Sequence, residues 1–279
     1  MGKKARQRLQ LFIIYALLLG GVVITVLPFW YMLITSFKPQ SYIFEMPPRL
    51  IPTEVTLKNY TAALGKDLFD LYFLNSLFVA ITSTALTVAV SSMLAYAFAK
   101  LEFPGRELIF RTLLIGMMIP SVMLIIPQFI VVRWLKLYNT FFALIFVYVT
   151  MNLSMQTFLL RGVFEGIPRD LEEAALMDGA SRWTIFWRMI LPLSRPGLAV
   201  VTIFTFLFSW TEFPWAHVAI KETTRRTLPI AIALFQGQHL TEWGQVFAAS
   251  VVAMIPIVIV FVVFQRQFIQ GIATTGMKG

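Results

Sequence analysis

Long runs without a charged residue constrain this chain more than any other feature of its sequence. A helix needs about 20 apolar residues to cross the roughly 30 Å hydrocarbon core of a bilayer. Five runs of this order contain no Lys, Arg, Asp or Glu, and a sixth is interrupted only by Glu212. The spans predicted from them cover residues 11–33, 71–99, 112–132, 137–160, 196–220 and 246–264. The predicted fold class is therefore all-α, a polytopic membrane helical bundle with six transmembrane helices in one domain, residues 1–279.

The composition agrees with a membrane protein and excludes several other classes. Of the 279 residues, 58% are hydrophobic and 13% charged, where globular domains have about 45–50% apolar and roughly 25% charged residues. The net charge of +9 comes from basic residues scattered between apolar runs, which does not form the clustered face of a nucleic-acid-binding protein. The chain has no cysteine, so disulfides, thiolate metal sites and a thiol nucleophile are excluded.

The basic residues predict the topology. Lys3, Lys4, Arg6 and Arg8 precede the first apolar run; this run exceeds the 7–15 residues of a signal peptide's apolar region, so we expect a retained helix rather than a cleaved leader. With the N-terminus inside, the inner segments hold 14 basic residues and the outer segments 9. Because Lys and Arg favour the cytoplasmic side, both termini are expected in the cytoplasm.

Five prolines fall inside the predicted spans. Each removes a backbone hydrogen bond and bends its helix. Neighbouring helices can satisfy the freed carbonyls, but broken helices also occur in proteins that open alternately to the two sides of a membrane. Both interpretations stay open for the five residues, which are Pro28, Pro120, Pro127, Pro214 and Pro256.

The cytoplasmic loop 161–195 is too charged to cross a membrane, and its pattern predicts two short helices. The first is expected to begin at Pro168 and to end at Gly179, where a left-handed residue is favoured. Its apolar face consists of Leu171, Ala174 and Ala175. Ser181 is the expected cap of the second helix, Pro192 is expected to stop it, and its apolar stripe consists of Trp183, Phe186, Trp187 and Ile190.

The spacing within this loop resembles a known motif. Glu173, Ala174 and Ala175 are followed after three residues by Gly179, and after nine more by Met189, one residue, Leu191 and Pro192. This pattern resembles the EAA loop of ATP-binding-cassette importer permeases, in particular those of maltose-type sugar importers. Met189 stands where the family has isoleucine. Shorter similarities extend over nearly the whole chain, among them Asn75-Ser76 and Trp210-Thr211-Glu212-Phe213.

The resemblance implies a function and a set of partners. The chain would be the permease subunit of an importer in the inner membrane of a bacterial or archaeal cell. The importer would move a sugar, such as a di- or oligosaccharide, by alternating access. Its partners would be a second, maltose-type permease subunit, two ATP-binding subunits and an extracytoplasmic solute-binding protein. The loop would carry a coupling helix that docks in a groove of the ATP-binding subunit. The coupling residues implied are Glu172, Glu173, Ala174, Ala175, Leu176, Asp178, Gly179, Trp183 and Pro192.

The chain itself is not expected to be an enzyme. A P-loop, which binds the phosphates of ATP, consists of a glycine, four further residues and then Gly-Lys-Ser/Thr. The Gly-Lys pairs that begin at Gly2 and Gly65 do not fit this pattern. We therefore expect no cofactor bound by this chain, and ATP and Mg to be used by partner subunits.

An alternative for the loop helix is an amphipathic helix on the inner leaflet, although its acidic residues suit anionic lipids poorly.

Seven residues are candidates for the solute pathway. Glu212 could bind a sugar hydroxyl beside Trp210, or it could lie in water at the outer end of its span, with Trp210 and Trp215 at the membrane interface. Amide side chains within membrane spans either line a solute path or form hydrogen bonds to neighbouring helices. The candidates are Trp210, Glu212, Phe213, Asn152, Gln156, Gln128 and Asn75. No metal site is expected, because His217 and His239 are too far apart in sequence to form a helical pair.

Two rival functions remain from the sequence alone. One is an ion-coupled secondary carrier with Glu212 as its proton site, although such carriers often show two similar halves and the sequence shows no convincing repeat. The other is a membrane scaffold or receptor that transports nothing and would need no stereotyped cytoplasmic loop.

Overall fold

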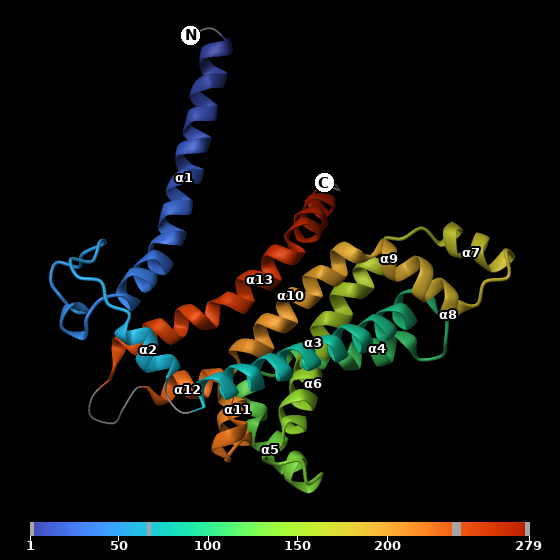
Figure 1. The fold of residues 1–279 in the computed structure, drawn as a ribbon. Helices are drawn as coiled ribbons and strands as arrows, with labels where there is room; N and C mark the ends of the chain where they lie inside the picture. The colour runs from blue at the N-terminus through green and yellow to red at the C-terminus, as the bar shows by residue number, and fades with distance from the viewer. Residues whose placement is uncertain (1–2, 66–67, 236–240, 277–279) are drawn as a thin grey trace. The chain divides into compact units, whose positions relative to one another are not determined.

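The computed structural model describes residues 3–65, 68–235 and 241–276, and helices dominate it (Figure 1). The longer helices are α1 (Lys3–Ser36), α3 (Phe69–Lys100), α4 (Arg106–Ile115), α5 (Ile125–Trp134), α6 (Phe141–Glu165), α7 (Arg169–Met177), α10 (Arg195–Thr211) and α13 (Trp243–Gly276). The shorter ones are η1 (Gln40–Tyr42), α2 (Lys58–Leu64), η2 (Gly116–Met118), η3 (Ser121–Leu124), α8 (Arg182–Ile185), η4 (Phe186–Ile190), α9 (Leu191–Leu193), α11 (Pro214–Ala219), η5 (Thr223–Arg225) and α12 (Leu228–Leu234).

Four helices are long and apolar enough to cross a membrane by themselves. They are α1, α3, α6 and α13, and they overlap the predicted spans 11–33, 71–99, 137–160 and 246–264. The ends of α6 differ from the prediction. It begins at Phe141 because the hydroxyl of Thr140 caps it, and it continues to Glu165, so the charged loop starts later than residue 161.

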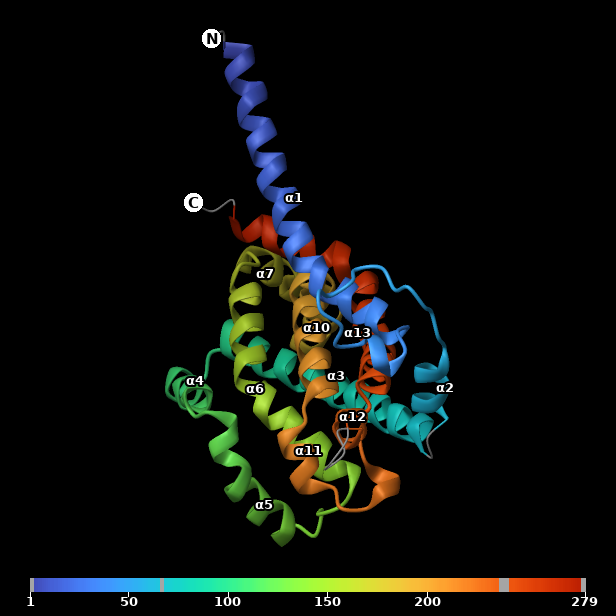
Figure 2. The same ribbon diagram turned by 90° about the vertical axis from the view of Figure 1, so that its left-hand side faces the viewer.

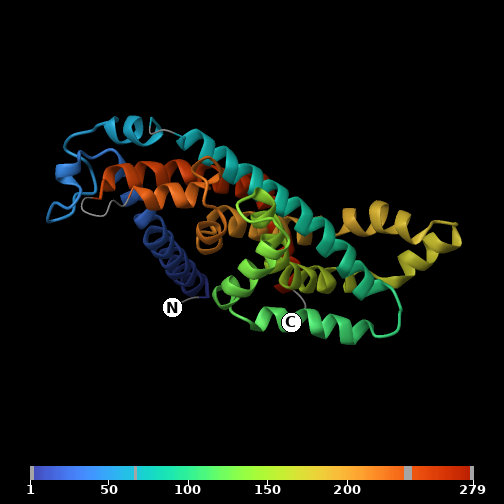
Figure 3. The same cartoon turned by 90° about the horizontal axis from the view of Figure 1, so that it is seen from below.

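The predicted span 112–132 is broken at Pro120, one of the prolines expected to bend its helix. The chain bends by 97° between the segments Arg106–Met118 and Ser121–Trp134 (Figure 2). Ile119 and Pro120 adopt extended backbone at the bend, with ψ of 118° and 129°. A proline disfavours helical backbone in the residue before it and donates no hydrogen bond, which explains the position of the break. Figure 3 shows that the chain reverses at the turn 101–105, so that α4 runs back from the end of α3.

The predicted span 196–220 is also shorter than expected. Helix α10 ends at Thr211, Glu212 has an extended backbone with ψ of 125°, and α11 begins at Pro214. Upstream, the second loop helix does not stop at Pro192. Its path continues through α9 to Leu193 and bends by 79° before α10. Counting each bent pair as one span gives up to six crossings, in agreement with the predicted bundle.

The chain divides into two compact units, the first being residues 1–69 and 232–254. In this unit the side chains of residues 7–30 of α1 are exposed, so this apolar helix has its surface free for lipid or another subunit. The segment after α1 is tied to α1 and α2. Asn59 donates to the carbonyls of Ser36 and Lys38, both at 2.8 Å, and buried Lys38 pairs with Glu45 at 3.2 Å.

The second unit, residues 70–231 and 255–279, contains the candidate site. Two clusters of buried apolar side chains stand out among its described residues. One packs α6 against α11 around Tyr148 and Trp215. The other packs the end of α3 against α6 and the segment 185–190, around Tyr96, Phe164 and Phe186. Helices α7 and α8 lie at one end of this unit and α5 and α11 at the other (Figures 1 and 2).

Helices α6 and α10 approach closely at a glycine. A Cβ atom on Gly197 would lie 2.8 and 3.0 Å from the two methyl carbons of Val163. We expect Gly197→Ala to lower stability by about 1–3 kcal/mol, the usual cost of overpacking, and Val163→Ala in the same chain to restore part of it. Thermal unfolding of the purified protein in detergent measures both. Equal stability of the single and double variants would contradict this account.

Candidate functional site

Helix α7 owes its bounds to local residues. Pro168 occupies the position before the first helical residue, and Asp170 and Glu172 lie in the first turn, where carboxylates interact favourably with the positive end of the helix dipole. The predicted start is thus one residue early, because Pro168 is the cap and Arg169 the first helical residue.

The end of α7 is a sharp, well-defined turn at Gly179. The amide of Gly179 donates to the carbonyl of Leu176 at 3.0 Å, and that of Ala180 to Ala175 at 2.9 Å. Gly179 has a φ of +84°, which confirms the left-handed glycine predicted here. This hydrogen-bond pattern is the Schellman motif, in which glycine avoids the strain of a side chain. No heavy atom lies within 4 Å of where its Cβ would be, so the turn faces open space.

One side of α7 is exposed and the other turns toward the rest of the unit. Leu171, Glu173, Ala174 and Met177 are exposed, and Met177 reaches 88% exposure. Ala175 and Leu176 are half-buried against the α3–α6 cluster. We call the exposed side, together with Asp178 and Gly179, the α7 face.

Glu172 lies on the opposite side from the α7 face. Its side chain is 4% exposed and forms an ion pair of 2.7 Å with Lys100 at the end of α3. Glu172 and Glu173 are neighbours in sequence, yet only Glu173 is available to another protein.

The second loop helix begins as predicted and then departs from a regular α-helix. The hydroxyl of Ser181 accepts from the amide of Thr184 at 3.1 Å. Residues 186–190 then form the π-helical turn η4, which shifts the side chains around the axis relative to an α-helix. The predicted apolar stripe is therefore split, since Phe186 and Ile190 are buried while Trp183 is 59% exposed and Trp187 48% exposed.

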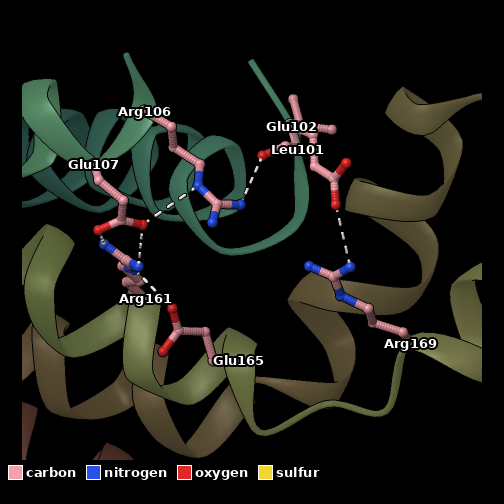
Figure 4. A network of polar contacts seen from close by, with 7 residues as sticks. All are labelled: Leu101, Glu102, Arg106, Glu107, Arg161, Glu165 and Arg169. Carbon is pink, nitrogen blue, oxygen red and sulfur yellow. Dashed lines mark hydrogen bonds and ion pairs between the residues drawn. The ribbon is translucent and has the colours of Figure 1, made fainter. Parts of the chain in front are cut away.

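Ion pairs tie the end of α6 and the start of α7 to α4 and to the turn before it (Figure 4). Arg161 in α6 contacts Glu165 at 2.7 Å and Glu107 at 2.8 Å. Arg169, at the start of α7, contacts Glu102 at 3.4 Å. Both side chains of the Arg169–Glu102 pair are well exposed, and exposed pairs of this kind contribute at most about 1 kcal/mol.

Glu212 occupies the break between α10 and α11 and binds groups of its own chain. Its carboxylate accepts from the Tyr148 hydroxyl at 2.7 Å and from the amides of Trp215 and Ala216 at 2.7 and 3.0 Å. Trp215 is fully buried and donates to the Ala143 carbonyl at 3.1 Å. The interpretation of Trp215 and Trp210 as interface residues is wrong, because the two indoles are 0% and 2% exposed.

The other pathway candidates do not gather at one place. Asn152 is one helical turn from Tyr148 and donates to its carbonyl at 2.8 Å. Asn75 instead donates to the carbonyls of Thr224 and Arg226, both at 2.9 Å. Phe213 stacks on the ring of His217.

Gln156 and Gln128 are the two candidates with an unused acceptor. The Oε1 atom of each is buried without a hydrogen-bond partner among the described residues. Gln156 is buried in α6 and Gln128 half-buried in α5.

The large groove of this unit is apolar. It has a volume of about 720 Å³ and is lined by α3, α10, residues 186–191 and residues 255–260 of α13. Thr84, Ser92 and Thr202 are among its lining residues, whereas none of the seven pathway candidates is. The described residues contain no group of three His, Asp or Glu side chains that could hold a metal. His239 lies outside the described residues.

Two residues with clear structural roles were missed in the sequence. Tyr148 binds Glu212, and Lys100 binds Glu172. A tyrosine four residues before Asn152 in an apolar run was a usable signal. Lys100 merely ends a long apolar run in the sequence, and nothing there connects it to residue 172.

Comparison with known proteins shows a family match. A family model described as a binding-protein-dependent transport system inner membrane component matches residues 87–274. The trehalose/maltose transport system permease protein of Thermococcus litoralis is 37% identical over 269 residues, which are 94% of this chain and 96% of that protein. The sulfoquinovosyl glycerol transport system permease protein of Agrobacterium fabrum is 36% identical over 252 residues, 90% and 88% of the two chains.

Solved structures agree with the fold. A chain of a bacterial ABC transporter involved in the import of the acidic polysaccharide alginate superposes with a TM-score of 0.79 and 25% identity, covering 96% of this chain and 99% of that one. A second chain, from an alginate transporter in complex with a periplasmic protein, superposes with a TM-score of 0.66 at 15% identity and covers 93% and 94%. At that identity the likeness concerns the fold alone.

Proposed function

Because the chain belongs to the family of binding-protein-dependent transport system inner membrane components, we propose that it moves a di- or oligosaccharide into the cell by alternating access. As a member it is a multi-pass membrane protein, the permease subunit of an ATP-binding-cassette importer, and not an enzyme. The observation that carries the proposed solute class is its identity of over a third, along nearly its full length, with permeases named for trehalose and maltose.

The proposed complex has four further components. They are a second permease subunit, two ATP-binding subunits and an extracytoplasmic solute-binding protein. ATP and Mg are used by the ATP-binding subunits, and this chain binds no cofactor of its own. Residues 1–279 serve as one transmembrane domain in this complex.

The proposed contact with an ATP-binding subunit is the α7 face. Glu173, Ala174 and Met177 are exposed there, and the Gly179 turn ends the helix without a side chain that would hold a partner away. Small residues permit close approach of another backbone, and exposed Met adapts to an irregular surface. Of the coupling residues taken from the resemblance, Glu173, Ala174, Asp178 and Gly179 belong to this face, whereas Glu172 acts inside the chain.

The proposed orientation places both termini and α7 in the cytoplasm. It rests on the excess of basic residues in the inner segments and on the fact that ATP is found in the cytoplasm. The inner-leaflet alternative for α7 is less favourable, because Asp170, Glu173 and Asp178 are exposed and anionic headgroups repel carboxylates.

A reconstituted transport assay tests the proposed function. We expect proteoliposomes holding all five components to take up maltose or trehalose only with binding protein outside and ATP inside. A protonophore should leave the initial rate unchanged, because the energy comes from ATP. Uptake that is independent of ATP and abolished by the protonophore would contradict the proposal. A complex that hydrolyses ATP in response to its binding protein but carries no saccharide would contradict the solute class alone.

The secondary-carrier alternative is not supported. The relatives are permeases of binding-protein-dependent importers, and Glu212 is bound by a tyrosine hydroxyl and two backbone amides of its own chain.

A further inference from the structure

Lys100 is a buried cation that none of the roles above explains. It is the last residue of α3, and its side chain is 2% exposed. A lysine is rarely buried unless its charge is paired, because desolvation of the ammonium group is costly. Ordinarily a lysine at the end of a membrane helix extends to the polar interface, whereas this one points into the protein.

The partners of Lys100 belong to the loop that carries α7. Its ammonium group donates to the carbonyl of Ile167 at 2.7 Å, just before α7 begins. It also forms the 2.7 Å ion pair with Glu172 in α7. The other carboxylate oxygen of Glu172 lies 3.8 Å from the guanidinium of Arg182, the first residue of α8. One buried charge pair therefore joins the end of α3 to α7, with α8 close by.

This pair differs from the other polar tether of α7. Arg169 and Glu102 also join α7 to the chain after α3, but their side chains are 59% and 80% exposed and 3.4 Å apart. Water and salt screen such a pair, whereas a buried pair is screened much less. Ala175 and Leu176 add apolar contacts, which are non-directional.

We propose that Lys100 is a positioning residue, which through Glu172 and the Ile167 carbonyl fixes the orientation of α7 on the end of α3 and so transmits displacement of the α7 face to that membrane helix. The proposal rests on the proposed function. It assigns the two adjacent acids different tasks, since Glu173 faces the ATP-binding subunit while Glu172 acts within the chain.

An apolar replacement separates positioning from stability. Replacing a buried ion pair by apolar residues of similar size often leaves stability unchanged, but it removes the charge attraction between the end of α3 and α7. The double variant Lys100→Met with Glu172→Leu should therefore assemble and hydrolyse ATP while transporting poorly. Lys100→Arg keeps a cation and serves as the conservative variant. The matched control is Arg169→Met, which removes the exposed pair on the same helix.

The experiment measures solute taken up per ATP hydrolysed in proteoliposomes, together with co-purification of the ATP-binding subunits. For the apolar double variant we expect this ratio to fall about tenfold, within the usual range of coupling between sites, with normal co-purification. Lys100→Arg should recover most of the ratio, and Arg169→Met should leave it at the wild-type value.

If the wild-type complex transports normally, three outcomes would overturn the proposal. The first is an unchanged ratio in the apolar double variant, which would make the pair a matter of stability alone. The second is failure of every Lys100 and Glu172 variant to assemble, which would assign the pair to folding. The third is an equal loss in Arg169→Met. A wild-type complex without ATP-driven uptake would instead contradict the proposed function, on which this inference rests.

Discussion

Replacing Gly179 with aspartate is expected to lower uptake per ATP hydrolysed about tenfold, as for the loss of a coupling between sites, while leaving the subunit in the membrane. The backbone φ of +84° costs a side chain about 1 kcal/mol of strain, too little to unfold the chain. The new carboxylate enters open space beside Asp178. It therefore obstructs the α7 face from outside rather than disturbing the interior.

Two variants at the same position separate charge, size and strain. Gly179→Asn has nearly the same shape as the aspartate and tolerates left-handed backbone, but carries no charge. Gly179→Ala adds only a methyl group, but it carries the same backbone strain of a side chain at positive φ. If bulk at the face is what matters, Asn and Asp will uncouple alike and Ala much less. Normal uptake in the aspartate variant, with the protein present in the complex, would show that α7 does not couple through this turn.

The bounds of α7 and α8 could be predicted because local residues determine them. Ser181 caps its own helix, and Gly179 supplies the left-handed residue of a turn whose hydrogen bonds span only six residues. The direction of Glu172 could not be predicted in this way. It depends on Lys100, 72 positions earlier, and a helical period alone does not tell which of two adjacent acids faces inward.

The breaks in two spans show the same limit. Pro28 and Pro256 lie inside continuous helices, while Pro120 and Pro214 follow breaks. All four lie in apolar runs, so hydropathy treats them alike. Whether a proline bends a membrane helix or ends it depends on which neighbours satisfy the freed backbone groups. At Pro214 the decisive neighbour is Glu212, whose carboxylate binds the next two amides.

Substituting Glu212 by alanine is expected to destabilise the subunit by about 2–4 kcal/mol. Two amides at the start of α11 lose their acceptor, a loss of helix capping worth about 1 kcal/mol. The Tyr148 hydroxyl is left without its partner in a residue that is 1% exposed, which costs roughly another 1–3 kcal/mol. The midpoint of thermal unfolding in detergent measures the sum, and the effect on uptake should follow from the lower amount of folded complex.

Tyr148→Phe is the matched control, because it removes the hydroxyl and leaves both amide bonds to Glu212 in place. Its cost should be about 1 kcal/mol, clearly below that of Glu212→Ala. Glu212→Gln keeps an acceptor for the amides and should fall between the two. A carboxylate that binds solute would behave differently. Glu212→Gln would then raise the KM for uptake several-fold at wild-type stability. That result would place Glu212 in the solute pathway and would contradict its role as the residue that joins α10 to α11.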